Sequence, residues 1–188
     1  MLDRILSPFA SIKGGEGANA VLLMLSVFIL LTAYYVLKVV REPLILSAGG
    51  AELKSYTAAA QAVLLVFLIP VYGAVANRVG RIRLISIVSV FFISNLVVFY
   101  FLAQANTPGL GAAFFIWVGI FNLMIIAQFW SFANDVYTPE QGRRLFGILG
   151  FGQTLGAATG GLISTVLIER LRVYELMLVA AALLAAYV

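Results

Sequence analysis

The chain has 188 residues, of which 63% are hydrophobic and only 11% are charged. Ordinary soluble domains carry roughly 25% charged residues, so this composition excludes a soluble globular protein and indicates one that spans a membrane. The sequence contains no His and no Cys, which excludes disulfides, thiol nucleophiles, imidazole bases and most transition-metal sites within these residues. We expect no catalytic residue, no metal and no cofactor.

The predicted elements are membrane-spanning helices, because four long stretches contain no Asp, Glu, Lys or Arg: 17–37, 55–77, 84–134 and 145–168. A helix crosses the membrane with about 20 residues, so the third stretch is long enough for two spans, divided at the polar, turn-forming residues 104–109. A sixth apolar segment follows Glu175. The sequence therefore predicts an all-α, polytopic membrane protein with an N-terminal segment (1–17) and a six-transmembrane-helix bundle (18–188). The expected spans are 18–40, 56–76, 83–103, 111–134, 145–167 and 174–188.

The sixth expected span is short, since only 13 residues follow Glu175. A helix that ends inside the membrane leaves carbonyl groups without partners, at a cost of several kcal/mol per group. We therefore expect a truncated sixth helix and a chain that is the first half of a twelve-span protein.

Basic residues near the span ends predict the orientation. An inside N-terminus places seven Lys and Arg on the cytoplasmic side and five on the other, and the positive-inside rule favours that arrangement. We expect a cytoplasmic N-terminus. The net charge of +4 does not indicate nucleic-acid binding, because the basic residues do not form one run.

The first span ends in a polar stripe. Tyr34, Lys38 and Arg41 recur at helical spacing, and Glu42 follows Lys38 by four residues and can pair with it. Two interpretations stay open. The basic side chains reach lipid head groups, or Lys38 and Arg41 face a central cavity and bind a phosphate or carboxylate.

The connection between the second and third spans contains Gly73, Asn77, Arg78, Gly80 and Arg81. So tight a connection requires a residue that adopts positive φ, and Gly80 is the expected one. A basic hairpin that only anchors the topology is the simpler interpretation of this loop.

The fourth span carries a second polar stripe of Gln128, Ser131 and Asp135, with Trp130 and Asn134 beside it. Polar groups at membrane depth are costly unless they pair or face a water-filled path. Interhelical hydrogen bonding and substrate contact explain this stripe equally well. Gln128, Trp130, Ser131 and Asn134 join the first-span stripe as candidate substrate contacts.

The fifth span is preceded by a helix start and contains a glycine groove. Thr138 is the expected N-cap, followed by Pro139 and by Gln141 three residues after the cap. Inside the span, small residues recur on one face, which favours close approach of a neighbouring helix. The glycines concerned are Gly152, Gly156, Gly160 and the adjacent Gly161.

These patterns resemble the major facilitator superfamily. The loop from Gly73 to Arg81 is similar to its signature GxxxDRxGRR, with Asn77 at the aspartate position; 139–147 is similar to its next cytoplasmic loop. The glycine set resembles the antiporter motif GxxxGPxxGG, with Ala157 at the proline position. The resemblance implies a six-helix N-terminal bundle that works with a C-terminal half by alternating access. It also implies a loop that holds one conformation of the cycle, although Asn77 cannot supply the ionic part of that role.

A narrower resemblance involves two segments, 38–44 and 129–135, which look like helices of the bacterial and plastid nucleotide (ATP/ADP) transporter family. That resemblance implies nucleotide recognition by the charged first-helix segment, at Lys38 with Arg41, and a location in the bacterial inner membrane. Every Asp and Glu lies at or beyond an expected span end. Anion exchange is therefore favoured over proton coupling.

We expect a secondary active transporter for a small anionic solute, with ATP/ADP exchange as the first candidate. Its expected partners are the solute, the lipid bilayer and the C-terminal half, and no nucleic acid. A transporter-like protein with an assembly or sensing role is the alternative. A membrane enzyme is disfavoured, because Asp135 and Glu140 with nearby arginines are too few for a catalytic cluster.

Overall fold

The computed structural model describes residues 15–188, which form helices and no β-strand. The helices are α2 (Gly17–Ala76), α3 (Arg81–Gln104), α4 (Leu110–Val136), α5 (Pro139–Ile168) and α6 (Glu175–Tyr187). Most of the expected N-terminal segment, 1–17, lies outside the described residues.

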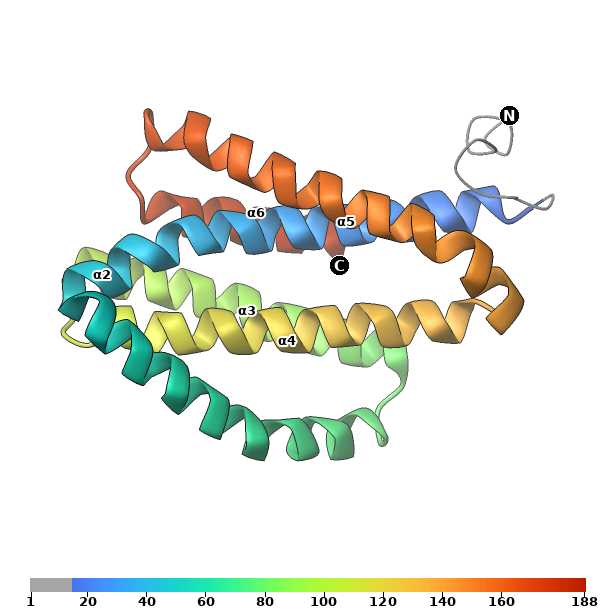
Figure 1. Cartoon of the computed structure of the whole chain (residues 1–188), viewed down its shortest axis with the longest axis horizontal. Helices are drawn as coiled ribbons and strands as arrows, with labels where there is room; N and C mark the ends of the chain where they lie inside the picture. Colours follow the sequence, from blue (N-terminus) through green and yellow to red (C-terminus); the bar gives the residue numbers. More distant parts are fainter. Residues whose placement is uncertain (1–14) are drawn as a thin grey trace.

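Helix α2 contains a sharp reversal. A straight helix of its 60 residues would be about 90 Å long, three times the thickness of the hydrocarbon layer. Gly49 (φ 179°, ψ 20°) and Gly50 (φ 66°, ψ −159°) interrupt the helical backbone, and the chain folds back there (Figure 1). We call 17–48 the first arm, 51–76 the second arm and the two glycines the hinge.

The two arms and α3 to α6 overlap the six segments where spans were expected. The second arm begins at 51 instead of 56, and α5 begins at Pro139 instead of 145. The largest difference is at the end of the first arm. The expected first span stopped at residue 40, whereas the first arm continues through Pro43, which lies inside the helix, to residue 48. Lys38 and Arg41 therefore lie well before the end of their helix. Pairing and burial of the residues after Arg41 explain why the helix continues past a charged Arg-Glu-Pro sequence.

Helices α2, α3, α4 and α5 are each long and apolar enough to cross a membrane, while α6 is a shorter apolar helix. This composition is that of an integral membrane protein. Consecutive segments run in opposite directions (Figure 1). The hinge, 105–109 and 169–174 therefore lie at one end, the hinge end; 77–80 and 137–138 lie at the other, the loop end.

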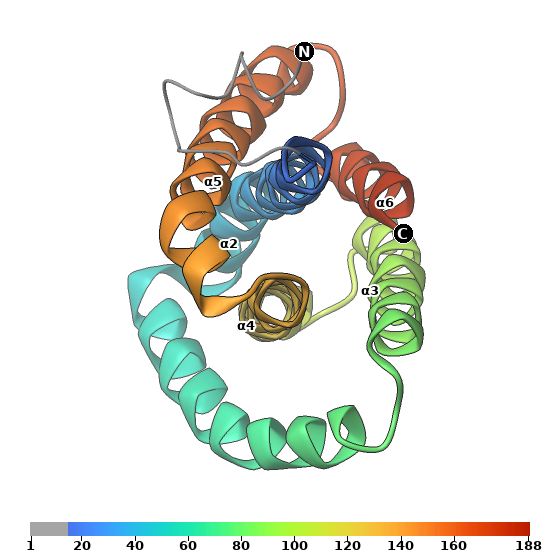
Figure 2. The ribbon, with the colours of Figure 1, turned by 90° about the vertical axis from the view of Figure 1, so that its right-hand side faces the viewer.

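The first arm forms the centre of the packing, against α5, α4 and α6. Its Val27, Leu30, Val36 and Leu37 are at most 1% exposed. The second arm curves around the outside (Figure 2) and is largely exposed, with Phe67 at 71%.

An aromatic cluster joins α3 to α4. Phe92 lies 5.3 Å from Trp117 and 5.1 Å from Phe121 between ring centroids, and Phe99 lies 5.2 Å from Phe114. These edge-to-face contacts fix the register of the two helices.

Candidate functional site

The first-arm stripe begins with Lys38, which packs against aromatic rings. Its Nζ lies 4.9 Å from the centroid of the Tyr35 ring and 5.9 Å from that of Tyr34. Both distances allow attraction between the ammonium and the ring faces. Within residues 15–188, Lys38 forms no ion pair with a carboxylate.

Arg41 is largely enclosed, with a side chain that is 15% exposed. Its Cζ lies 4.5 Å from the centroid of the Phe115 ring on α4, and its Nη2 donates to Glu42 Oε1 at 2.7 Å. Arg41 Nε is buried and has no acceptor among the described residues. Glu42 therefore engages Nη2 of the guanidinium and leaves the Nε–H without an acceptor among the described residues.

The predicted pairing of Glu42 with Lys38 is wrong. Glu42 accepts from Arg41 and, through Oε2, from Lys54 Nζ at 2.5 Å. The hinge brings the second arm, with Lys54, back toward Glu42, and helical spacing within one arm cannot reveal this partner. Lys54 is thus a charged neighbour of the stripe, contributed by the second arm, that was not predicted from the sequence.

The two predicted stripes lie at different depths. Arg41 contacts α4 at Phe115, and Gln128 follows Phe115 by 13 residues, which is about 20 Å along a helix. The structure therefore does not bring Arg41 and Gln128 into one site.

The residues of the α4 stripe differ in burial and in contacts. Gln128 is 5% exposed, and neither atom of its amide has a partner among the described residues. Trp130 packs edge-on against Phe129 and against Phe146 of α5. Ser131 is half-buried, and Asn134 is exposed.

The loop end shows why positive φ was not needed between the second and third spans. Gly80 has φ −59° and ψ 142°, an extended conformation open to any residue, so the prediction of positive φ at Gly80 is wrong. The second arm ends at Ala76, and the N–H of its C-cap Asn77 donates to Gly73 O at 3.1 Å. Gly80 serves as the N-cap of α3. Arg78 is exposed.

Arg81 connects this loop to the end of α4. Its Nε lies 2.7 Å from Asp135 Oδ2, and both side chains are nearly half exposed. Solvent-exposed ion pairs of this kind contribute about 0–1 kcal/mol. Asp135 is thereby engaged with α3 and not with Gln128 or Ser131.

A second ionic contact at the loop end joins the start of α2 to α5. Arg144 donates from Nη2 to Glu16 Oε1 at 2.9 Å and from Nη1 to Glu16 Oε2 at 3.1 Å, while Gln141 Nε2 donates to Oε1 at 3.1 Å. Both charged side chains are under 20% exposed. Burial and the negative charge of Glu16 raise the pKa of the nearby Tyr137 phenol. Local sequence patterns do not reveal this contact, since Glu16 and Arg144 are 128 residues apart.

The start of α5 follows the predicted pattern. Thr138 Oγ1 accepts from Gln141 N at 3.3 Å, and Gln141 Oε1 accepts from Thr138 N at 2.9 Å. This capping box, with Pro139 at the first helical position, confirms the predicted helix start.

Three of the four glycines predicted to form a groove in α5 lie against the first arm. A Cβ on Gly152 would meet Met24, one on Gly156 would meet Phe28 and Leu31, and one on Gly160 would meet Thr32 and Tyr35, all inside van der Waals distance. Gly161 has nothing within 4 Å of its Cβ position and takes no part in this contact.

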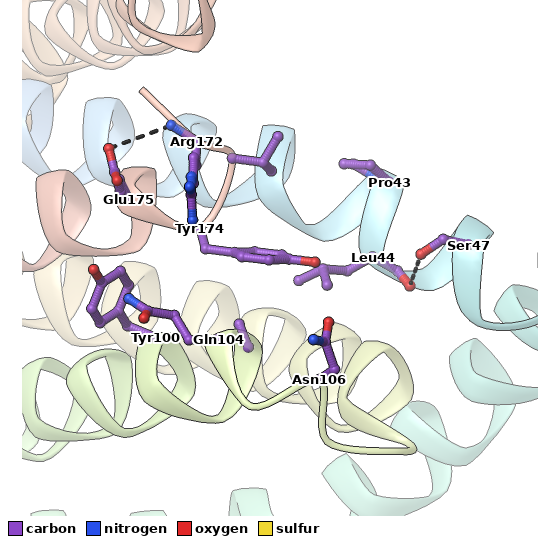
Figure 3. A pocket seen from close by; sticks show the side chains of 11 residues that line it. Pro43, Leu44, Ser47, Tyr100, Gln104, Asn106, Arg172, Tyr174 and Glu175 are labelled. Atoms are coloured by element: carbon purple, nitrogen blue, oxygen red, sulfur yellow. Dashed lines mark hydrogen bonds between the residues drawn. The ribbon is translucent and has the colours of Figure 1, made fainter. Parts of the chain in front are cut away.

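A cavity of about 510 Å³ opens at the hinge end. Tyr100, Gln104 and Tyr174 line it together with the end of the first arm, and Arg172 N donates to Glu175 Oε2 at 3.4 Å on its rim (Figure 3). None of the predicted site residues lines this cavity. Its walls come from segments that are far apart in sequence, so periodicity alone could not find it.

No group of three or more acidic side chains that could hold a metal ion occurs in the part of the chain that the structure describes. Comparison with protein-family models, with curated proteins and with solved structures finds no match for this chain. Its class therefore rests on its own features: an all-helical protein whose long apolar helices are those of an integral membrane protein.

Proposed function

We propose that this chain is the N-terminal six-helix bundle of a secondary transporter of the major facilitator type, with a cytoplasmic N-terminus, and that it exchanges a small anionic solute. The antiparallel order of six apolar segments supports this proposal. So do the contacts between the glycines of α5 and the first arm, since closely packed helices can move as one body in alternating access.

The observation that carries the substrate class is Lys38. It lies inside an apolar helix, eleven residues before the hinge, without a carboxylate partner in residues 15–188. A cation at membrane depth is costly, and such residues mark solute pathways. An anion is the ligand that offsets this cost most directly, and a nucleotide is the first candidate because 38–44 and 129–135 resemble nucleotide transporters.

Exchange in vesicles tests the proposal. The protein, expressed from its complete gene and reconstituted with ATP inside, should take up labelled ADP. Lys38→Ala should lower the initial rate at least about tenfold, because one charge-assisted contact contributes about 1.5–3 kcal/mol, whereas Arg170→Ala, an exposed charge at the hinge end, should leave it unchanged.

Two results would contradict the proposal. Absence of ADP, ATP or phosphate exchange by a folded protein would favour an assembly or sensing role, which the Asn77 substitution in the signature loop also favours. Exchange that is unaffected by Lys38→Ala would remove Lys38 from the solute path.

A further inference from the structure

The three charged groups beside the hinge, Arg41, Glu42 and Lys54, have a net positive charge. Arg41 and Lys54 both contact the same carboxylate, that of Glu42, at 2.7 and 2.5 Å. The cluster therefore carries two positive charges and one negative charge. Each oxygen of the Glu42 carboxylate accepts from one cation, Oε1 from Arg41 and Oε2 from Lys54. Glu42 therefore uses only one donor of each cation.

The unused donor of Arg41 points to a ligand. Its Nε–H is buried without an acceptor among the described residues, and leaving a charged donor unpaired costs more than leaving a neutral one. A guanidinium presents Nε and one Nη as a fork that fits two oxygens of a phosphoryl or carboxyl group. Glu42 engages Nη2 only.

The cluster is open to an incoming molecule. Glu42 is 35% exposed and Lys54 38% exposed, while Phe115 covers the face of the guanidinium. An anion can therefore reach the side of the cluster where Glu42 and Lys54 are partly exposed, while the buried Nε–H of Arg41 lies behind the carboxylate that the anion would displace. The two cations come from opposite arms of α2, so whatever binds both also fixes the angle at the hinge.

We propose that Arg41 and Lys54 form a binding site for a phosphoryl group, and that the Glu42 carboxylate occupies this site as an internal counter-ion until the anion displaces it. This inference rests on the proposed anion transport and adds a second cationic position to it, on the second arm. Binding replaces one carboxylate with a group that carries more oxygens and more charge, so both cations gain contacts.

Equilibrium binding to the full-length protein in phosphatidylcholine nanodiscs tests the site, with inorganic phosphate and ADP as probes. Glu42→Gln removes the competing carboxylate and should tighten phosphate binding about tenfold, and Lys54→Gln should weaken it about tenfold, the scale of one charge-assisted contact. Lys54→Arg should retain binding. Glu52→Gln, an exposed carboxylate on the second arm, and Arg170→Gln are matched controls that should change nothing.

The outcomes separate this inference from the transport proposal. Three results would overturn the site, even if exchange through Lys38 is intact. The first is equal affinity for phosphate in all variants, and the second is weaker phosphate binding by Glu42→Gln than by the wild type. The third is that neither the wild type nor Glu42→Gln binds phosphate or ADP. Tighter binding by Glu42→Gln without any exchange in vesicles would support the site and contradict transport. An unchanged melting temperature of Lys54→Gln distinguishes lost binding from lost folding.

Phosphoryl groups also occur on lipids, and a second titration identifies the source. If phosphatidic acid in the nanodisc competes with soluble phosphate for the wild type but not for Lys54→Gln, the phosphoryl group that binds is that of a lipid. If soluble phosphate binds equally in both lipid compositions, it is that of a solute. Both results support the site and differ only in its occupant.

Discussion

Replacing Gly156 with alanine tests how closely α5 packs on the first arm. The added Cβ would lie 3.0 Å from Phe28 Cα and 3.1 Å from Leu31 Cβ, and still closer to the Phe28 carbonyl oxygen. Two of these three contacts are with backbone, which cannot rotate away as a side chain can. The helices must therefore separate.

The expected magnitude follows from three contributions. Overpacking costs about 1–3 kcal/mol, and separation of the helices weakens the bond from Thr32 Oγ1 to Gly156 O, now 3.2 Å, at a cost of about 1 kcal/mol. Against this, alanine is favoured over glycine in a helix by about 1 kcal/mol. The net loss is about 1–3 kcal/mol, and at 2–4 °C per kcal/mol for a chain of this size the melting temperature should fall by about 2–12 °C.

Thermal unfolding in detergent, followed by tryptophan fluorescence and by monodisperse elution, measures this shift. Gly161→Ala is the matched control, because it lies in the same helix with nothing within 4 Å of the new Cβ and should be neutral or slightly stabilising. If Gly156→Ala melts at or above the temperature of Gly161→Ala, the close approach of α5 to the first arm is refuted.

Four further substitutions test the hinge and the loop end by the same measurement. Gly50→Ala should lower the free energy of unfolding by about 1–3 kcal/mol, because φ 66° and ψ −159° is a conformation that only glycine adopts readily. Gly80→Ala is the control and should leave it unchanged, since Gly80 has φ −59°. Equal effects of the two substitutions would contradict the hinge. Glu16→Gln should cost about 1–3 kcal/mol, since it weakens two charge-assisted hydrogen bonds in a largely buried contact. Asp135→Asn should cost under about 1 kcal/mol because its ion pair with Arg81 is exposed, and a larger loss than that of Glu16→Gln would reverse this ranking.

Local patterns predicted the elements well where a single segment carries the signal. The charge-free stretches placed the helices, because apolar runs of this length are stable only in lipid or in a core. The capping box at Thr138 and Gln141 placed the start of α5, since its hydrogen bonds join residues three positions apart.

Features that depend on a reversal of the chain were predicted poorly. The end of the first arm was placed at residue 40, because Arg41, Glu42 and Pro43 look like a polar connection when they are considered without partners. Lys54 and Phe115 are those partners, and they come from other segments. The chain turns at Gly49 and Gly50, where glycine permits the backbone that the reversal requires.

The sequence by itself determined that this protein is helical and composed for a membrane, since composition and charge spacing depend on no contact between segments. It also marked Lys38 and Arg41 as charges at unusual positions. Only the tertiary structure decided which groups these two side chains contact. The hinge brings Lys54 to Glu42, the Glu42 carboxylate binds Arg41, and Lys38 lies against two tyrosine rings. The physical reason is that ion pairing depends on distances of a few ångströms between arms of a folded helix, and those distances are set by the hinge and by packing on α4, not by spacing along the chain.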